Sequence, residues 1–190
     1  MTHPFVIRPV MRDDFHKWLT LWEGYNAFYD RVGPTALPDA VTQATWRRFF
    51  DVYEPMHALV AEDDGNLLGL VHFLYHRSTI IVEATCYLHD LFTAQTTRGK
   101  GVGRALISAV FERARNAGLN RVYWHTDESN KRSMVLYDQM ADKPGLVMYR
   151  KTLYQPHNGS FLAEAHGQPS EQQGAGAAWP TEGPLPVGRR

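Results

Sequence analysis

The chain has 190 residues, a length that suits one domain with or without a tail. Its 20 Lys and Arg residues equal its 20 Asp and Glu residues, and this balance argues against a nucleic-acid binder held by overall charge. The single cysteine, Cys86, excludes an intrachain disulfide and a zinc site built from several cysteines. The nine histidines are scattered and form no HExxH pair, so no metal site is expected.

Neither a targeting segment nor a membrane span is predicted. Residues 1–14 lack the basic segment and the apolar run of a signal peptide. The densest apolar run, 67–75, is far shorter than the roughly 18 residues that a membrane-spanning helix needs. We therefore expect a cytoplasmic protein without membrane contact.

The first third of the chain predicts one strand and two helices. The apolar run 5–7 predicts a strand, and Asp13 is placed to cap the helix that follows. A break at 33–34 separates this helix from a second one, which starts at Asp39 and ends at 54–55. Apolar side chains recur at helical spacing in both segments. They are Phe15, Trp18, Leu19, Trp22 and Tyr25 in the first, and Trp46, Phe49, Phe50 and Tyr53 in the second.

Strands then alternate with helices. The sequence DDGN at 63–66 is a strong turn signal and predicts a hairpin. We predict strands over 57–61, 67–76, 80–93, 121–126 and 146–153, and helices over 103–117 and 130–140. This order indicates one mixed α/β domain over residues 1–154. The six Gly and five Pro of residues 155–190, with few large apolar side chains, predict a disordered tail.

The glycine-rich segment 98–104 (RGKGVGR) is the most informative part of the sequence. It lies between a predicted strand and a predicted helix, where consecutive backbone N–H groups and the helix N-terminus can surround an anion. Glycine allows a ligand to approach closely, and three basic side chains add positive charge. A phosphate or pyrophosphate is the natural ligand, and a tight turn without a ligand is the alternative.

Two common phosphate-binding motifs do not fit this loop. A Walker loop needs GxxxxGK followed by Ser or Thr, and a dinucleotide fingerprint needs a third glycine where Arg104 stands. The remaining pattern, R/Q-x-x-G-x-G/A, is satisfied by Arg98, Gly101 and Gly103.

Two motifs together resemble a known family. Residues 87–93 (YLHDLFT) followed by 98–103 resemble the acyl-CoA-binding core of the GNAT N-acetyltransferases. Within the family they are most similar to the spermidine/spermine and histone/polyamine acetyltransferase-like branch. Residues 130–137 (NKRSMVLY) fit the family pattern of Asn, then Ala or Ser three residues on, then Tyr seven residues on. The predicted element order also fits, from about residue 4 to 153.

Three positions depart from the family pattern. The family often has Val at the position of Thr93 and Pro at that of Gln95, where backbone atoms act. The diamine-type enzymes often have an acid where this chain has His89. This last difference weakens the expectation of a polyamine substrate.

The resemblance implies the fold and the use of acetyl-CoA. The GNAT fold is an α/β fold with a mixed, mostly antiparallel central sheet of about six to seven strands. About four helices flank the sheet, and its central strands splay apart to hold the pantetheine arm. The implied acetyl-CoA-binding residues are Leu91, Phe92, Thr93, Arg98, Gly99, Lys100, Gly101, Val102, Gly103, Arg104, Asn130 and Ser133. Asn130 could instead, or in addition, cap the last predicted helix.

Acetyl transfer to an amine needs a proton donor for the thiolate and a route for the amine proton. The resemblance assigns the donor role to Tyr137, which on periodicity alone is also a core tyrosine. His89 and Asp90 are candidate bases, with ordered water as the alternative. Strand alternation predicts that these two side chains face opposite sides of the sheet. We expect Cys86 to be a buried strand residue and not a nucleophile.

We expect a small-molecule amine as acceptor, held near Tyr25, Tyr29 and Asp30, because aromatic rings and a carboxylate suit a cation. Transfer would be direct, in a ternary complex. The alternatives are a lysine or N-terminus of a protein, and a non-catalytic acyl-CoA-binding regulatory domain. The resemblance also makes a homodimer an expectation.

Overall fold

The computed structural model describes residues 5–153. It divides the chain into two units, Met1–Lys143 and Pro144–Arg190. The elements in chain order are β1 (Val6–Pro9), η1 (Arg12–Asp14), α1 (Phe15–Phe28), η2 (Gly33–Thr35), α2 (Asp39–Arg48), β2 (Met56–Asp63), β3 (Asn66–His76), β4 (Thr85–Thr93), η3 (Gln95–Thr97), α3 (Val102–Asn116), β5 (Val122–Tyr123) and α4 (Lys131–Tyr137). The predicted mixed α/β class is confirmed.

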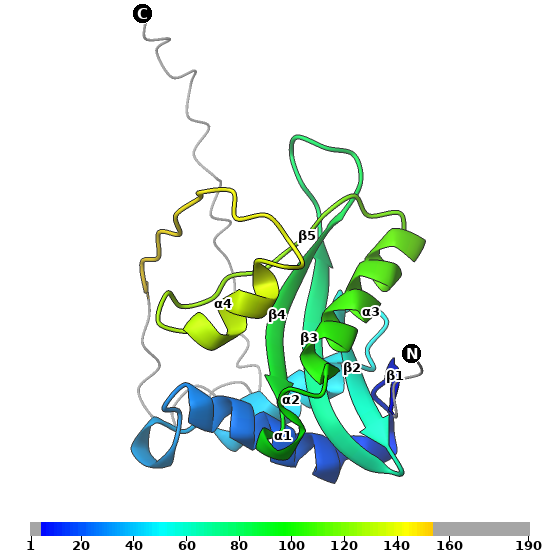
Figure 1. The fold of residues 1–190 in the computed structure, drawn as a ribbon, viewed down its shortest axis with the longest axis vertical. Coiled ribbons are helices and arrows are strands. Elements are labelled where there is room, and N and C mark those ends of the chain that lie inside the picture. The colour runs from blue at the N-terminus through cyan, green and yellow to red at the C-terminus, as the bar shows by residue number, and fades with distance from the viewer. Residues whose placement is uncertain (1–4, 154–190) are drawn as a thin grey trace, which may run out of the picture. The chain divides into compact units, whose positions relative to one another are not determined.

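The sheet of the described residues has five strands in the order β1-β2-β3-β4-β5. Strands β1 to β4 pair with one another in antiparallel fashion, whereas β4 and β5 are parallel. A parallel pair needs a crossover connection, and α3 supplies it. Helix α3 packs on one face of the sheet, and α1 and α2 pack on the other (Figure 1).

Burial of both faces explains the apolar sequence of the central strands. Successive residues of β2 alternate between two cores: Leu59 and Ala61 belong to the α3 side, and Ala58 and Val60 to the α1 side. A sheet covered on both faces needs apolar residues at consecutive positions.

The predicted strand at 146–153 is wrong. Within the described part of the second unit, residues 144–153 form neither helix nor strand. Leu146 and Tyr149 are 86% and 91% exposed. β-branched and aromatic composition favours a strand only where a neighbouring strand supplies hydrogen bonds. Within residues 5–153 the sheet therefore has five strands instead of the six or seven expected, and the predicted tail from 155 lies outside the described residues.

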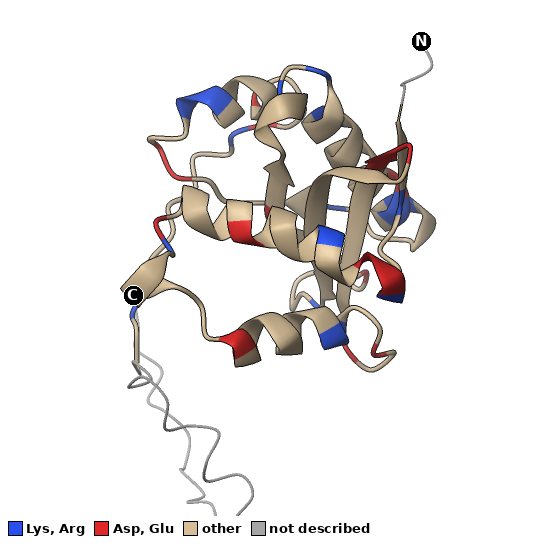
Figure 2. Cartoon of the chain, turned by 90° about the horizontal axis from the view of Figure 1, so that it is seen from below, with Lys and Arg blue, Asp and Glu red and all other residues tan. Residues whose placement is uncertain are grey.

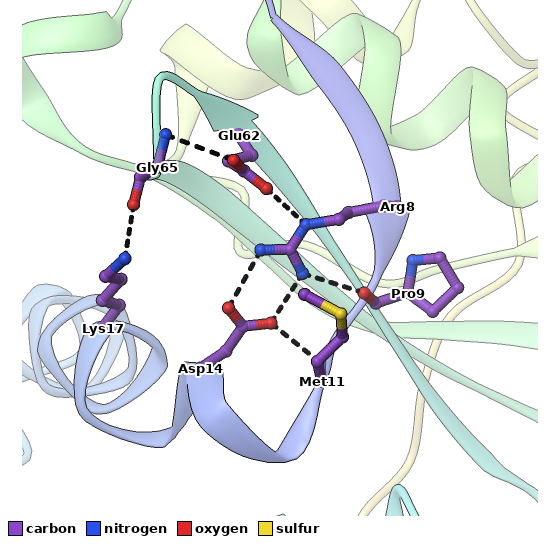
Figure 3. A network of polar contacts seen from close by, with 7 residues as sticks. All are labelled: Arg8, Pro9, Met11, Asp14, Lys17, Glu62 and Gly65. Atoms are coloured by element: carbon purple, nitrogen blue, oxygen red, sulfur yellow. Dashed lines mark hydrogen bonds and ion pairs between the residues drawn. The ribbon is translucent and has the colours of Figure 1, made fainter.

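A network of polar contacts fixes the start of α1 to the sheet (Figure 3). The Arg8 guanidinium on β1 donates to both Asp14 carboxylate oxygens, at 2.6 and 2.9 Å, and also to Glu62 on β2. Asp14 also accepts from the Met11 N–H at 2.7 Å. Lys17 donates to the carbonyl of Gly65 in the β2–β3 turn at 2.6 Å. These contacts set the direction in which α1 crosses the sheet.

Acidic and basic residues occur together on the same elements (Figure 2). Helix α2 carries Asp39 in its first turn and Arg47 and Arg48 in its last, which complements the helix dipole. Among the described residues, no helix is both long and apolar enough to cross a membrane.

Candidate functional site

A cavity of about 670 Å³ lies where α1, β4, the start of α3 and α4 meet. Most of the residues predicted to act at the site line it. They are Tyr25, Tyr29, His89, Leu91, Phe92, Thr93, Arg98, Gly99, Gly101, Val102, Gly103, Arg104, Asn130, Ser133 and Tyr137. The predicted Asp30, Asp90 and Lys100 are not among the lining residues.

The cavity occupies the gap between β4 and β5. The two strands pair only briefly, and the last paired residues are Tyr87 and Tyr123. Beyond them the strands separate, and Leu88 and Trp124 line the cavity. On its other edge, β4 stays paired with β3 as far as Thr93. The predicted splaying is confirmed, and the edge of β4 at the gap keeps backbone groups that an extended ligand could use.

The glycine-rich loop leads into the first turn of α3. Gly99 and Gly101 have φ angles of 80° and 82°, a region that is strained for residues with a Cβ atom. The C=O of Gly101 accepts from the N–H of Ala105 at 3.0 Å. Within the described chain, the N–H groups of 102–104 have no acceptor. Free N–H groups at the start of a helix form an anion site.

His89 lies in a β-bulge of β4. His72 on β3 pairs with Asp90, and Phe73 pairs with Leu88, so His89 is the extra residue between them. The prediction that His89 and Asp90 face opposite sides is therefore wrong, because a bulge breaks the alternation of the strand. Nδ1 of His89 lies 3.1 Å from Oδ1 of Asp90.

Asp90 is buried at the centre of a hydrogen-bonded chain. Its Oδ2 lies 3.0 Å from Nδ1 of His72. Nε2 of His72 accepts from the indole N–H of Trp18 at 3.0 Å. An indole nitrogen can only donate, so the proton of His72 is on Nδ1 and is donated to Asp90. Trp18 thus fixes the tautomer of His72, and His72 holds the Asp90 carboxylate.

His89 and Asp90 shift each other's pKa in opposite directions. Burial opposes ionisation of Asp90, but the hydrogen bonds with His72 and His89 outweigh it and lower the pKa of Asp90 well below its usual range. The hydrogen bond with Asp90 raises the pKa of His89 above its ordinary value, although burial opposes the shift. Asp90 is therefore an ionised partner, and His89, with its side chain 53% exposed, is the member that faces the cavity.

Two tyrosines of the α1 end form the aromatic wall of the cavity. The ring of Tyr25 stacks on Trp22 at 5.4 Å and meets Tyr29 edge to face at 5.1 Å. Burial, followed by the negative charge of Asp90, raises the pKa of both tyrosines. Both hydroxyls stay protonated at neutral pH and can donate hydrogen bonds.

Helix α4 brings Tyr137 to the cavity. Its ring meets Trp124 edge to face at 5.4 Å. Burial raises the pKa of Tyr137, and an interaction with the Ser133 hydroxyl partly opposes this. The amide of Asn130 donates to Thr126 at 3.2 Å and makes no capping hydrogen bond to α4, so the structure does not support the alternative in which this side chain caps the helix.

Comparison with known proteins identifies the family. Residues 18–141 match the model of the Acetyltransferase (GNAT) family. The chain belongs to the GNAT acetyltransferases. It is 34% identical over 151 residues to the D-amino-acid N-acetyltransferase HPA3 of Saccharomyces cerevisiae, covering 78% of this chain and 91% of that one. It is an N-acetyltransferase, and acetyl-CoA is its acetyl donor.

Two further relatives extend the comparison. The L-ornithine N5-acetyltransferase NATA1 of Arabidopsis thaliana is 30% identical over 79 residues, 42% of this chain and 35% of that one. The crystal structure of an aminoglycoside acetyltransferase, meta-AAC0020, from an uncultured soil metagenomic sample has a TM-score of 0.68 at 16% identity, covering 79% of this chain and 97% of that one. This last likeness shows the fold.

Two side chains that the sequence analysis considered, Asp30 and Cys86, are not among the residues that line the cavity of this GNAT domain. Asp30 follows the end of α1 with a φ angle of 56°, and it does not line the cavity. The expected acidic partner for a cation is thus not provided there. Cys86 is buried, and burial raises the pKa of its thiol to about 12, which agrees with a structural strand residue.

Sequence reasoning missed several residues that shape the GNAT site. A Cβ atom on Gly69 of β3 would lie 2.7 Å from the Phe92 carbonyl oxygen, so only glycine fits there. His72 stands alone in a buried apolar run, which is a signal for a satisfied polar group, but its partners Trp18 and Asp90 are 54 and 18 residues away. Arg31 lies against the aromatic wall.

Proposed function

We propose that this GNAT acetyltransferase transfers the acetyl group of acetyl-CoA directly to the amine of a small molecule, with both substrates bound at once. One observation carries the proposal: His89 and Tyr137 line the same cavity as the free N–H groups at the start of α3. A proton acceptor, a proton donor and an anion site thus share one space.

The start of α3 suits the pyrophosphate of acetyl-CoA. The free N–H groups of 102–104 and the positive end of the helix would bind the two phosphates. A Cβ atom on Gly99 would meet nothing within 4 Å, so space is present beside the loop. Arg98 at the cavity wall would add positive charge, whereas Lys100 would act only from a distance.

The edge of β4 suits the pantetheine arm and the thioester. The backbone of Phe92 and Thr93 would pair with the arm as a neighbouring strand does. The N–H of Leu91 or Phe92 would polarise the thioester oxygen. Asn130 and Ser133 would hold the arm from the α4 side. Acetyl-CoA supplies the activated acetyl group.

His89 would remove the proton from the amine. Its Nδ1 is engaged with Asp90, so Nε2 is the nitrogen left to accept a proton. Asp90, held by His72, would act as a positioning residue that orients the imidazole and stabilises its charged form.

Tyr137 would give a proton to the departing thiolate. Its raised pKa keeps the phenol protonated until the thiolate forms, and the residue lines the cavity. With His89 on β4 and Tyr137 on α4, the two protons would be handled by residues of different elements.

The acceptor would be a small molecule, not a protein. Three aromatic residues of α1 and its C-terminal end, Tyr25, Phe28 and Tyr29, line the cavity. The relatives named for D-amino acids and L-ornithine act on small amines, by their names. The resemblance also suggested a polyamine acceptor. The lining residues include no Asp or Glu that could pair with the additional positive charges of a polyamine.

The test is acetyl transfer from acetyl-CoA to a pooled amine panel, read by product mass. The pool contains D- and L-amino acids, diamines and polyamines, aminoglycosides and lysine peptides. An acetylated small amine supports the proposal. Product from lysine peptides alone would assign a protein acceptor and overturn it, as would the absence of any product while acetyl-CoA still raises the melting temperature.

A further inference from the structure

Arg31 is a cation stacked on Tyr25 and Tyr29, two residues that line the cavity, although Arg31 itself is not among the lining residues. Its guanidinium carbon lies 5.3 Å from the ring centre of Tyr25 and 5.2 Å from that of Tyr29. Among residues 5–153, no carboxylate lies within 4.0 Å of the guanidinium, and its buried Nε has no hydrogen-bond acceptor. A partly buried guanidinium with free donors is a site for an anion that the protein does not itself supply.

The backbone holds Arg31 in this place. The N–H of Arg31 donates to the carbonyl of Asn26 in α1 at 3.0 Å. The preceding residue, Asp30, has a φ angle of 56°, which turns the chain back toward the helix. A non-glycine residue in this region carries a small energetic cost, and such strain is common beside ligand sites.

The charge of Arg31 acts on groups that line the cavity. It opposes the effect of burial on the pKa of Tyr25 and Tyr29, and it opposes the effect of Asp90 on the pKa of His89. The guanidinium is thus stacked on the aromatic wall, and its charge also acts on His89, the proposed base.

The carboxylates near this end are either engaged or outside the cavity lining; Asp30, which precedes Arg31, forms no ion pair with it and does not line the cavity. Asp90 is held by His72 and His89. Asp127, which also influences Tyr29, accepts from the N–H of Ser129 at 2.8 Å and does not line the cavity. An acceptor with several positive charges would meet the Arg31 cation without a free carboxylate to balance it.

We propose that Arg31 binds the carboxylate of the acceptor, so that the acceptor is an amino acid whose amine meets His89. This rests on the proposed function of the same site. A guanidinium donates two parallel hydrogen bonds to a carboxylate, and the Tyr25 and Tyr29 rings hold its plane. In an α-amino acid, a single carbon separates the amine from the carboxylate. A cation near the proposed base therefore favours acceptors that carry a carboxylate beside the reacting amine.

The test compares acceptors that differ only in the carboxylate. Each amino acid of the panel, in D and L form, is assayed beside its amide and its decarboxylated amine; ornithine and putrescine are one such pair. We expect kcat/KM about 10- to 100-fold higher for the acid than for its amide, the range of a charged hydrogen-bonded pair. Arg31→Met should remove this preference, mainly through KM of the acid, and Arg31→Lys should restore part of it.

Arg12→Met is the matched control. Arg12 is stacked in a similar way, 4.6 Å from the ring centre of Phe50, but Phe50 does not line the cavity, whereas Tyr25 and Tyr29 do. The Arg12 variant should keep the ratio of acid to amide. Equal rates for acid, amide and amine in the wild-type protein, or an unchanged ratio in a folded Arg31→Met, would overturn the role of Arg31 alone. No product from any amine would overturn the proposed function itself.

Discussion

The two ends of the cavity are built from different parts of the chain. At the loop end, the proposed contacts come from consecutive backbone N–H groups of residues 102–104, next to two glycines with positive φ. At the acceptor end, they come from side chains on separate elements: Tyr25 on α1, His89 on β4 and Tyr137 on α4.

This difference predicts how each end responds to substitution. A site made of backbone N–H groups depends on conformation, so it tolerates changes of side chain but not of backbone geometry. We therefore expect the side chain of Arg104 to matter less than its backbone N–H, because its guanidinium donates a hydrogen bond to Gln139. A site made of side chains depends on each functional group and on the residues that orient it.

The largest effect is expected for Tyr137→Phe. Loss of the hydroxyl should lower kcat by about 10²- to 10⁴-fold, the usual contribution of a positioned acid. KM for acetyl-CoA should change little, because the phenyl ring still packs on Trp124. Tyr53→Phe, on a tyrosine that is 93% exposed and outside the cavity, is the control. Steady-state kinetics with wild-type turnover in Tyr137→Phe would remove Tyr137 from the acid role.

His89→Gln should have the next largest effect, about 10²-fold on kcat/KM, because water can reach the half-exposed site and partly replace the base. In the wild-type protein, kcat/KM should fall as the pH drops through the pKa of His89, at a midpoint above 6.5 because Asp90 raises it. The variant should lose this limb. A pH profile that is the same in both proteins would exclude His89 as the base, and exposed His16→Gln is the control.

Gly101→Ala should raise KM for acetyl-CoA by about 10-fold and leave kcat nearly unchanged, since a Cβ atom at a φ of 82° shifts the backbone that binds the anion. Gly118 has a φ of 75° after α3 and does not line the cavity, so Gly118→Ala carries similar strain. Kinetics and melting temperature are measured for both variants. If both raise KM equally, the effect is general strain and the loop is not the site.

The smallest kinetic effect is expected for a substitution of Arg8, which does not line the cavity. Arg8→Met should lower the free energy of unfolding by about 1–3 kcal/mol at neutral pH, through loss of the hydrogen bonds to Asp14. The Arg8 hydrogen bond, although burial opposes it, lowers the pKa of Asp14 below 3.8.

The stability from Asp14 should therefore be present above about pH 4 and lost as the pH falls through its lowered pKa. Chemical denaturation at several pH values would measure this, and the difference between wild type and Arg8→Met should shrink in acid. Both Michaelis constants should stay unchanged in the variant. A changed KM for either substrate would show that the start of α1 reaches the site.

Local sequence predicted much of the loop end. The conformation of the loop at 98–104 could be predicted from its glycines, because positive φ and close ligand approach require glycine whatever the rest of the chain does. The same holds for helix α3, whose buried Leu106, Val110 and Ala114 follow the helical period. The strand predicted at 146–153 failed because pairing, unlike helical periodicity, needs a partner from elsewhere.

The sequence by itself determined the family, the mixed α/β fold and the glycine-rich loop before α3, because each of these depends on short-range patterns of residues. Only the tertiary structure established how the side chains at the acceptor end are arranged. The β-bulge that turns His89 toward Asp90 depends on the register between β3 and β4. The Trp18–His72–Asp90 chain and the position of Arg31 depend on how α1 lies on the sheet. Such contacts join residues far apart in the chain, so no local pattern encodes them.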